Sequence, residues 1–493
     1  VSLFIRDAHL SHPLLLFTKV FDPKDNYEER QWLDVRIGLD WSGIDFNTHE
    51  FILQADPKSA FCLSEPRYKK GAGKAGKIIF VVFDGVRSDH VGCYGYQRNT
   101  TPHIDAFSKD AVLFRQAQVQ GEWTLTSFMS FLTGLYPSAH GVFHPTLYQH
   151  LHPKITTLPQ ILREHGFINR CYFTHKRLVS NFGFARGFDS HIFRQCDKEN
   201  RIAFADDVMT YGVDMLDFHK DDDLFLMLHF FDTHQPCNPA SPYSDIFDKT
   251  YPSEAIKDVR TYLLKNKKQS LPPRDIQNLI ARYDAEIYRQ DKRFGLLVEY
   301  LKATGGYDEA TIIFTSDHGM LLGDHGDLAT IQLFDESLRV PLLIKFPYSI
   351  CNKRGVEVSD AAIESNLDIM PTILDLLSIK NTAPTQGKSL LTLVNGRSPG
   401  GNKEDSIISE SFFKDTYTVS IRDKDSRYTA KADCDFSDIS KIDFKVKNEK
   451  LYEIRDISPT EIERKDNFGM DRYRQRVFNH VQEIKDYLER LKR

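Results

Sequence analysis

Three apolar runs each end directly on a cluster of polar residues. Residues 78–83 (IIFVVF) run into Asp84, residues 224–228 are followed by HFFDTH, and residues 310–314 are followed by TSDHG. Short runs that are almost entirely apolar, interrupted only by Thr311 in the third, predict strands that are buried on both faces, as in a parallel sheet. Because ligands bind at the carboxyl ends of parallel strands, the three polar clusters are predicted to meet at one edge of a sheet.

Stretches between these runs carry the spacing of amphipathic helices. Residues 157–165 and 276–301 are the clearest examples. Buried strands whose connections are helical make an α/β fold. The sequence therefore predicts a mixed central sheet flanked by helices.

Changes in composition divide the first part of the chain. The basic, glycine-rich stretch at 66–77 (PRYKKGAGKAGK) is typical of an exposed linker. Before it, alternating apolar residues at 33–41 and a short apolar run at 51–53 predict strands. These strands indicate a small β-rich module over residues 1–65, and the α/β domain is placed at 78–400.

A second small subdomain is predicted at 401–493. Short alternating segments at 417–422 and 442–446 indicate a small sheet. The charged segment 471–493 carries one apolar stripe at helical spacing, so a terminal helix is expected to dock on that sheet. The stripe consists of Val477, Val481, Ile484, Tyr487, Leu488 and Leu491.

Composition narrows the classes of function. With 41% hydrophobic and 27% charged residues among 493, the chain is expected to fold as a soluble protein. A net charge of -5 gives no electrostatic support for nucleic-acid binding or an anionic membrane surface. No apolar run approaches the roughly 20 residues that a transmembrane helix needs. The seven cysteines form no CxxC pair, so neither a disulfide framework nor a zinc cluster is predicted. No secretory signal opens the visible chain at Val1, which favours a cytoplasmic location.

An aspartate and a histidine stand side by side after the third apolar run. Taken singly, Asp84 and Asp317 are equally well explained as helix caps or turn residues. Together with His318 they form a set of oxygen and nitrogen ligands that suits a divalent cation. The sequence therefore predicts one divalent metal site at the sheet edge.

Eight sequence blocks extend this interpretation. They are FDGVRSDHVGCYGYQRNTTPHIDAF, LTGLYPSAHGV, GFARGFD, LHFFDTHQP, TSDHGMLLGDHGDL with LFDESLRVPLLI, NLDIMPTILDLL, QGKSLL and LYEIRDISPTE. In this order, from about Lys77 to Asn467, they resemble the sulfatase family of the alkaline phosphatase superfamily. The resemblance implies an alkaline-phosphatase-like α/β fold and a hydrolase that acts on ester bonds.

In the family, the catalytic nucleophile lies nine residues before the threonine of LTG. That position corresponds to Thr124, counted from Thr133. The C/S-x-P/A-x-R signal for oxidation to formylglycine is absent, since Thr126 and Phe128 replace its Pro/Ala and Arg. The resemblance then implies a metal-activated threonine that attacks phosphorus and becomes phospho-threonine. The alternative is that Thr124 merely caps a helix.

The resemblance also implies the metal ligands and their number. They are Asp84, Asp317, His318 and, as fourth or bridging ligand, Thr124. Gly85 stands where many family members have a second aspartate, so manganese or zinc is favoured over calcium. A two-metal centre needs a late histidine, and beyond His325 the sequence has only His480, within the predicted terminal helix. One metal ion is therefore expected.

Further site residues follow from the same blocks. His234 matches the histidine that contacts the transferred group or protonates the leaving oxygen, and His140 is a second catalytic candidate. Two family lysines are absent, with His175 and Thr330 in their places. The candidates for substrate binding are Arg87, His175, Arg177 and His229. For each histidine the alternative is a structural hydrogen bond, and for each arginine a solvated surface position.

Three functions are compatible with these residues. The leading hypothesis is metal-dependent hydrolysis or transfer of a phosphate ester, with phosphodiesters or phosphonate monoesters favoured. The second is hydrolysis of sulfuric esters without formylglycine, and the third is a non-catalytic family member that binds an anion. The complete ligand set argues against the third. The substrate is expected to be an ester of a small molecule, glycan or lipid head group, and a homo-oligomer is left open.

Overall fold

The computed structural model divides the chain into two compact units, residues 1–71 and 72–493. The residues that it describes are 2–7, 14–18, 49–54, 76–143, 149–194, 204–235, 237–249, 272–328, 333–351, 354–358, 365–394, 406–413, 415–433, 448–455, 460–464 and 470–492. Each unit is considered separately below.

The first unit contains a three-stranded antiparallel sheet. Its strands are β1 (Ser2–Asp7), β2 (Leu14–Thr18) and β3 (His49–Gln54), in the order β2-β1-β3. β3 contains the strand expected at 51–53. The strand expected at 33–41, and the linker up to residue 75, lie outside the described residues.

An eight-stranded sheet forms the centre of the second unit, in the order β11-β5-β10-β9-β4-β8-β6-β7. The strands are β4 (Lys77–Phe83), β5 (Val112–Phe114), β6 (Ile168–Phe173), β7 (Ser190–Phe193), β8 (Leu224–Phe230), β9 (Ala310–Ser316), β10 (Leu342–Lys345) and β11 (Val356–Val358). The three strands predicted from apolar runs are confirmed as β4, β8 and β9. β4 is parallel to both of the others, with Phe83 opposite Phe230 and Ser316, so the three polar clusters leave the sheet at one edge.

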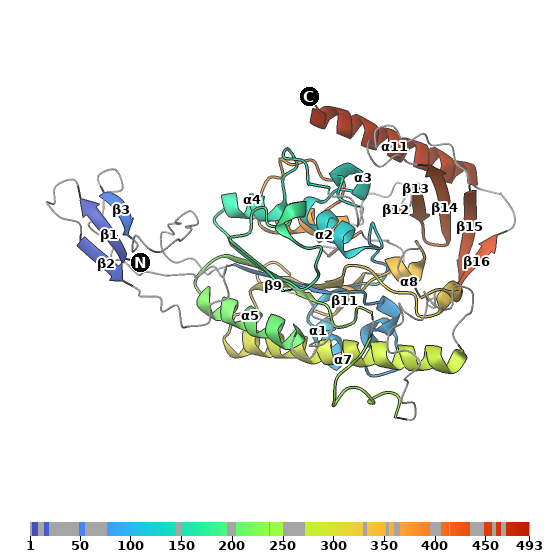
Figure 1. The fold of residues 1–493 in the computed structure, drawn as a ribbon, viewed down its shortest axis with the longest axis horizontal. Coiled ribbons are helices and arrows are strands. Elements are labelled where there is room, and N and C mark those ends of the chain that lie inside the picture. The colour runs from blue at the N-terminus through green and yellow to red at the C-terminus, as the bar shows by residue number, and fades with distance from the viewer. Residues whose placement is uncertain are drawn as a thin grey trace. The chain divides into compact units, whose positions relative to one another are not determined.

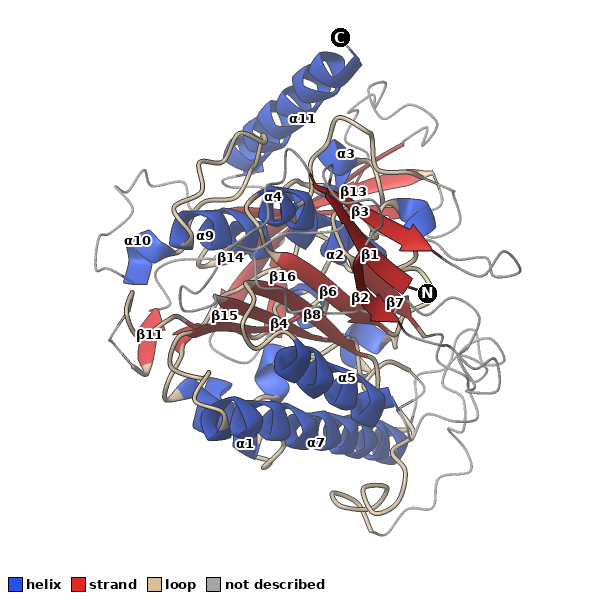
Figure 2. Ribbon diagram, turned by 90° about the vertical axis from the view of Figure 1, so that its left-hand side faces the viewer, coloured by secondary structure: helices blue, strands red, loops and turns tan. Residues whose placement is uncertain are grey.

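Helices cover both faces of this sheet (Figures 1 and 2). One layer contains α1 (Pro102–Ser108), α5 (Phe204–Phe218) and α7 (Pro273–Ala303); the other contains α2 (Thr124–Thr133), α4 (Leu158–Glu164) and α9 (Ile369–Leu376). Alternate residues of β4 enter two different hydrophobic cores, with Phe80 in one and Val81 in the other. The run is apolar throughout because both faces are covered. The predicted α/β fold and the helices expected at 157–165 and 276–301 are confirmed.

The remaining helices of the main body are short. They are α3 (Pro137–His140), α8 (Asp335–Leu338), α10 (Leu391–Val394) and the 3₁₀ turns Ser88–His90, Gly92–Tyr94, Ser180–Phe182, Asp324–Gly326 and Asn366–Asp368. Across the described ranges, no helix has both the length and the apolar character needed to cross a membrane.

A five-stranded antiparallel sheet and a long helix complete the unit. The strands follow chain order: β12 (Ile407–Phe413), β13 (Thr416–Arg422), β14 (Ser426–Asp433), β15 (Asn448–Arg455) and β16 (Thr460–Arg464). The helix is α11 (Met470–Lys492). The expected strand at 417–422 is confirmed as β13, whereas 442–446 lies outside the described residues.

The apolar stripe of α11 packs against two cores. Val477 and Val481 join the core of the small sheet, while Ile484 and Tyr487 join the main core that also contains α2. The predicted docking of the terminal helix on the small sheet is confirmed. The same helix also ties that sheet to the central α/β body.

A buried carboxylate lies beneath α11. Glu410 of β12 accepts hydrogen bonds from Ser138 Oγ at 2.8 Å, from the Tyr417 hydroxyl at 2.5 Å and from His480 Nε2 at 3.0 Å. Burial would raise the pKa of Glu410, but His480 and the other donors hold it below its usual range. The carboxylate therefore stabilises the fold at neutral pH and loses this contribution as the pH falls.

We expect His480→Ala to lower the free energy of unfolding by about 2 to 4 kcal/mol, because it leaves a buried carboxylate without one of its hydrogen-bond donors. Glu489→Ala, at an exposed position of the same helix, is the control and should change stability by less than about 0.5 kcal/mol. Urea titrations at neutral pH compare the two variants. Equal stability of both would show that His480 does not support Glu410.

Candidate metal centre and active site

A left-handed glycine sets the turn after β4. Gly85 has φ of 69°, and its N–H donates to Asp317 Oδ1 at 3.0 Å. A Cβ at this position would lie 3.3 Å from Met320 Cε, so a side chain would be both strained and crowded. The preceding N–H, of Asp84, donates to Phe230 O at 2.8 Å. These bonds hold Asp84 beside Asp317.

Asp84, Asp317 and His318 each offer a ligand atom, and the three atoms lie within 4.8 Å of one another. All three side chains are buried, and within the described part of the chain Asp84 Oδ1 and Asp317 Oδ2 have no hydrogen-bond partner. Burial and then repulsion by Asp84 raise the pKa of Asp317. For Asp84, burial acts in the same direction, but the surrounding histidines, His234 foremost, bring its pKa well below the usual range. Two buried carboxylates with unused oxygens fit a bound cation.

His318 is oriented by its own loop. Its Nδ1 lies 2.8 Å from the carbonyl oxygen of Gly319, which can only accept, so Nδ1 carries the proton. The lone pair of Nε2 is therefore directed into the cluster, as expected of a metal-binding histidine with a backbone partner behind it. Burial would lower the pKa of His318, but the Asp317 and Asp84 carboxylates raise it.

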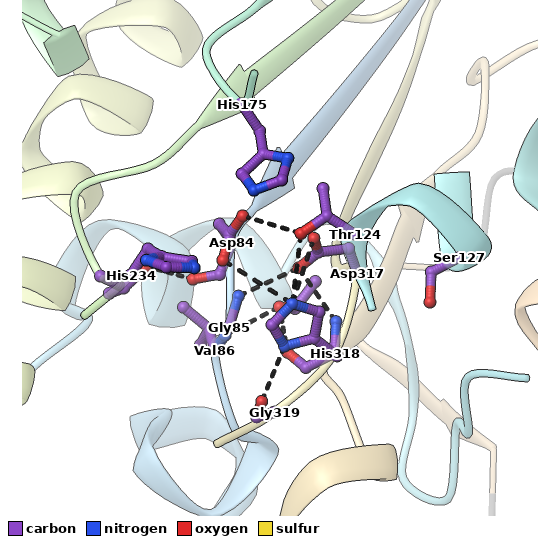
Figure 3. Close-up of polar contacts among 12 residues, drawn as sticks. Asp84, Gly85, Val86, Thr124, Ser127, His175, His234, Asp317, His318 and Gly319 are labelled. Carbon is purple, nitrogen blue, oxygen red and sulfur yellow. Dashed lines mark hydrogen bonds and ion pairs between the residues drawn. The ribbon is translucent and has the colours of Figure 1, made fainter. Parts of the chain in front are cut away.

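Thr124 faces these ligands from the first residue of α2 (Figure 3). Its hydroxyl donates to Asp84 Oδ2 at 3.2 Å and lies 3.3 Å from His318 Nε2. Trp123, not Thr124, occupies the N-cap position, so the alternative that Thr124 only caps the helix is wrong. Ser127, one turn later, points away and donates to Gly121 O at 2.9 Å.

A pocket opens above Thr124 and His318. Its other lining residues are Trp123, Leu125, Phe143, His175, Arg177 and His234. The structure thus brings together Thr124, His318, His175, Arg177 and His234, five of the residues singled out in the sequence. Among the described residues, the Arg177 guanidinium has no ion-pair partner, so a cationic group is available to a negatively charged substrate.

The two pocket histidines differ in their hydrogen bonding. His234 Nδ1 donates to Gln235 O at 2.8 Å, and its ring stacks on Phe231 with centroids 4.4 Å apart. Nε2 is thus the nitrogen of His234 that can exchange a proton with a ligand. His175 Nδ1 accepts from the N–H of Arg177 at 3.4 Å, and burial holds the pKa of His175 well below its usual range. His175 is therefore a neutral donor through Nε2.

The family model described as sulfatase matches residues 77–379, more than half of the chain. The chain belongs to the sulfatase family. A second model, described as N-sulphoglucosamine sulphohydrolase, C-terminal, matches residues 323–483 of this sulfatase-family chain. These matches confirm the predicted family and make the chain a sulfatase-like hydrolase of ester bonds.

One curated relative and two solved structures are similar to this chain. The ulvan-active sulfatase of Formosa agariphila is 28% identical over 372 residues, which cover 69% of this chain and 69% of the relative. The phosphonate monoester hydrolase of Agrobacterium radiobacter has a similar structure, with a TM-score of 0.64, 18% identity and coverage of 83% of this chain and 95% of that one. A protein solved with its substrate D-glucosamine-2-N,6-O-disulfate gives a TM-score of 0.63 at 18% identity, covering 85% and 98%. The two structural matches establish the alkaline-phosphatase-like fold.

Two candidates of this sulfatase-family chain do not reach the pocket. The Arg87 guanidinium pairs with Asp89 at 2.8 Å and with Asp324 at 2.6 Å, so its charge is already neutralised. His140 lies in the buried turn after α2, where Nε2 is 3.2 Å from Ser130 Oγ. Burial lowers the pKa of His140 to about 3, so it is not a proton donor at neutral pH. The structure thus argues against substrate contact by Arg87 and proton transfer by His140.

His229 reaches the metal cluster rather than the pocket. It is the second-last residue of β8, is fully buried and does not line the cavity. Its Nε2 lies 3.4 Å from Asp84 Oδ2, and its Nδ1 lies 3.0 Å from Thr174 Oγ1. His229 was expected to bind substrate, but its position makes it a partner of Asp84.

Sequence reasoning missed the apolar wall of the pocket. Trp123 and Leu125 flank Thr124 directly, and this adjacency was the available signal. Phe143 follows the HGV block and closes the same wall. Sequence reasoning also missed Glu122, a buried residue two positions before Thr124. Burial raises the pKa of its carboxyl to about 7.

Proposed function

We propose that the chain hydrolyses or transfers phosphate esters, with phosphodiesters or phosphonate monoesters favoured, through a covalent phospho-threonine at Thr124. One observation carries the proposal. The Thr124 hydroxyl is within hydrogen-bonding distance of both Asp84 Oδ2 and His318 Nε2. It lies at the base of a pocket lined by Arg177, which has no ion-pair partner among the described residues.

Asp84, Asp317 and His318, completed by Thr124, are the residues that would hold one divalent cation. When bound, manganese, zinc or calcium would lower the pKa of the threonine hydroxyl and offset negative charge on the ester. One buried oxygen each of Asp84 and Asp317 has no hydrogen-bond partner in the described part of the chain, which supports this assignment. Asp84 Oδ2 also accepts a hydrogen bond from the Thr124 hydroxyl, which orients Oγ1.

The pocket residues supply the remaining roles. Arg177 and His175 bind non-bridging oxygens of the ester, which places phosphorus above Thr124 Oγ1. As the Oγ1–P bond forms, the P–O bond to the leaving group breaks, and His234 Nε2 supplies the proton that the leaving oxygen needs. Water or an acceptor alcohol then gives a proton to His234 Nε2 and attacks phosphorus, and the Oγ1–P bond breaks. The product is a phosphate monoester or a phosphonate, or its ester with the acceptor, and solvent returns to Oγ1 the proton that it lost in the first step.

Position 128 supports phosphate over sulfate chemistry. Formylglycine needs Cys or Ser at 124 and Arg at 128, whereas this chain has Thr124 and a fully buried Phe128. The Phe128 ring lies 5.0 Å from that of His229, inside the core, where an arginine would be costly to bury. A sulfated threonine lacks the second hydroxyl through which hydrated formylglycine ejects sulfate. A phospho-threonine can be cleaved by in-line attack.

The apolar wall favours a leaving group with a flat face. Trp123, Leu125 and Phe143 lie beside Thr124 in the pocket lining. An aryl ring, or the apolar face of a sugar, can pack on such side chains. The proposed substrates are therefore esters of a small molecule, a glycan or a lipid head group that presents such a face.

Matched aryl esters test the choice of substrate. We expect kcat/KM for an aryl phosphodiester or aryl phosphonate monoester to exceed that for the aryl sulfate by at least about tenfold, or ~1.4 kcal/mol in transition-state stabilisation. Each substrate is assayed with manganese, zinc and calcium in turn. A preference for the sulfate ester over many turnovers would contradict the proposal.

Hydrolysis of sulfate esters is the second candidate. It is favoured by the match to the N-sulphoglucosamine sulphohydrolase model and by the similarity to the ulvan-active sulfatase. Under this alternative, a threonine or water must expel sulfate without formylglycine. Single-turnover assays separate the two functions, because the phosphate proposal expects the sulfate ester to stop after at most one event per active site.

A further inference from the structure

The edge of the small sheet runs beside the segment that leads to Thr124. β12 is the terminal strand of that sheet and pairs with β13 on one side only. On its other side, Ser409 Oγ donates to Val119 O at 2.7 Å, and the N–H of Glu410 donates to Gln120 O at 2.8 Å. The open edge of the sheet is therefore closed by residues 119–122, which precede α2.

A side-chain hydrogen bond ends this contact two residues before the nucleophile. The Ser411 hydroxyl donates to Glu122 Oε1, and both side chains are buried. Glu122 directly precedes Trp123, the N-cap of α2. The Ser411–Glu122 bond thus links the small sheet to the residue that precedes the N-cap of α2.

The segment has little room to shift without moving α2. Ser127 Oγ, in the first turns of the helix, donates to Gly121 O at 2.9 Å. A Cβ on Gly121 would lie 2.6 Å from Thr126 Cγ2, so this segment touches the helix closely. A displacement at Glu122 is therefore transmitted to the residues on both sides of Thr124.

We propose that Glu122 and Ser411 are positioning residues, through which the small C-terminal sheet holds the Thr124 hydroxyl against Asp84 and His318. Neither side chain lines the pocket, so they act through the backbone of residues 121–124. A shift of about 1 Å in a reacting group can cost on the order of 100-fold in rate. The kinetic part of this proposal rests on the proposed function of Thr124.

Removing one hydroxyl from β12 tests the proposal. We expect Ser411→Ala to lower kcat on the aryl phosphodiester by at least about tenfold, with KM within about twofold of wild type. Ser409→Ala is the matched control, because it removes the same group from the same strand but releases only Val119. Its kcat should stay within about twofold, and Ser411→Thr, which keeps a hydroxyl, should recover most of the wild-type rate.

Variants of Glu122 complete a double-mutant cycle with Ser411→Ala. Glu122→Gln keeps a carbonyl that accepts from Ser411 and should lose less activity than Glu122→Ala. The double variant of Glu122→Ala and Ser411→Ala should be no slower than the worse single variant, because both break the same bond. Additive losses would show that the two residues act separately and would overturn the proposal.

Hydrogen exchange of residues 119–127 gives a measurement that needs no substrate. Ser411→Ala and Glu122→Ala should speed exchange of these amides, and Ser409→Ala should do so less. If wild type turns over no ester, the proposed function fails while exchange still tests the positioning. Two outcomes would overturn the positioning proposal. One is equal exchange and equal kcat in the Ser409→Ala and Ser411→Ala variants. The other is a lower melting temperature of Ser411→Ala with unchanged kcat.

Discussion

Thr124→Ala is expected to lower kcat by at least about 1,000-fold, because the hydroxyl that faces Asp84 and His318 is removed. The helix should remain intact, since Trp123 and not Thr124 is its N-cap. Steady-state kinetics measure the loss, and mass spectrometry of acid-quenched wild type should find phosphate on Thr124. Near-normal turnover by the alanine variant would show that water attacks the ester directly.

Two variants control for this result. Thr124→Ser retains a hydroxyl and should keep part of the activity, because the neighbouring ligands can still orient it. Thr133→Ala makes the same change at the other end of α2, where the hydroxyl donates to Met129 O, at 2.7 Å, and to no other described residue. It should leave kcat within about twofold of wild type. A loss as large as that of Thr124→Ala would indicate damage to the helix.

Asp317→Asn is expected to remove most of the bound metal and, with it, the activity. The amide oxygen can still accept from the N–H groups of Gly85 and His318, at 3.0 and 2.9 Å in the wild type, so the turn should persist. The lost carboxylate oxygen is the one that has no partner among the described residues. Elemental analysis should therefore show the metal content falling from about one per chain towards zero.

The metal-free protein offers a second measurement for this variant. Because burial and then repulsion by Asp84 raise the pKa of Asp317, replacing its carboxyl with a neutral amide should make the metal-free variant at least as stable as metal-free wild type. Asp308→Asn, an exposed position before β9, is the control and should retain full metal and activity. Full occupancy and normal turnover in Asp317→Asn would contradict the ligand assignment.

The sequence was sufficient to predict where the candidate metal ligands meet. Asp84 and Asp317 each follow a buried apolar strand, and parallel neighbours place such residues at one edge whatever the loops do. The order of the sequence blocks then located Thr124. These predictions depended on local pattern and on sheet geometry, which the chain specifies over short distances.

Predictions about individual charged and aromatic side chains were less successful, because partners distant in sequence decide them. Arg87 is held by its neighbour Asp89 and also by Asp324, which lies 237 residues away. His229 points inward because the alternation of β8 turns it towards Asp84. Glu122 and Ser411 share no motif, and nothing near either residue indicates the other. Such pairings follow from tertiary packing alone.

The bond between Glu122 and Ser411 joins residues that are 289 positions apart. During synthesis from the N-terminus, the ribosome therefore makes Asp84, Thr124 and Asp317 well before it makes the strand that holds the Thr124 loop. Domains and their parts fold as the chain emerges, and contacts of large sequence separation form late. The central sheet can thus assemble before the bond between Glu122 and Ser411 has formed. If Thr124 is the nucleophile, catalytic competence would then arise at the end of folding, when β12 packs against residues 119–122, which were translated long before it.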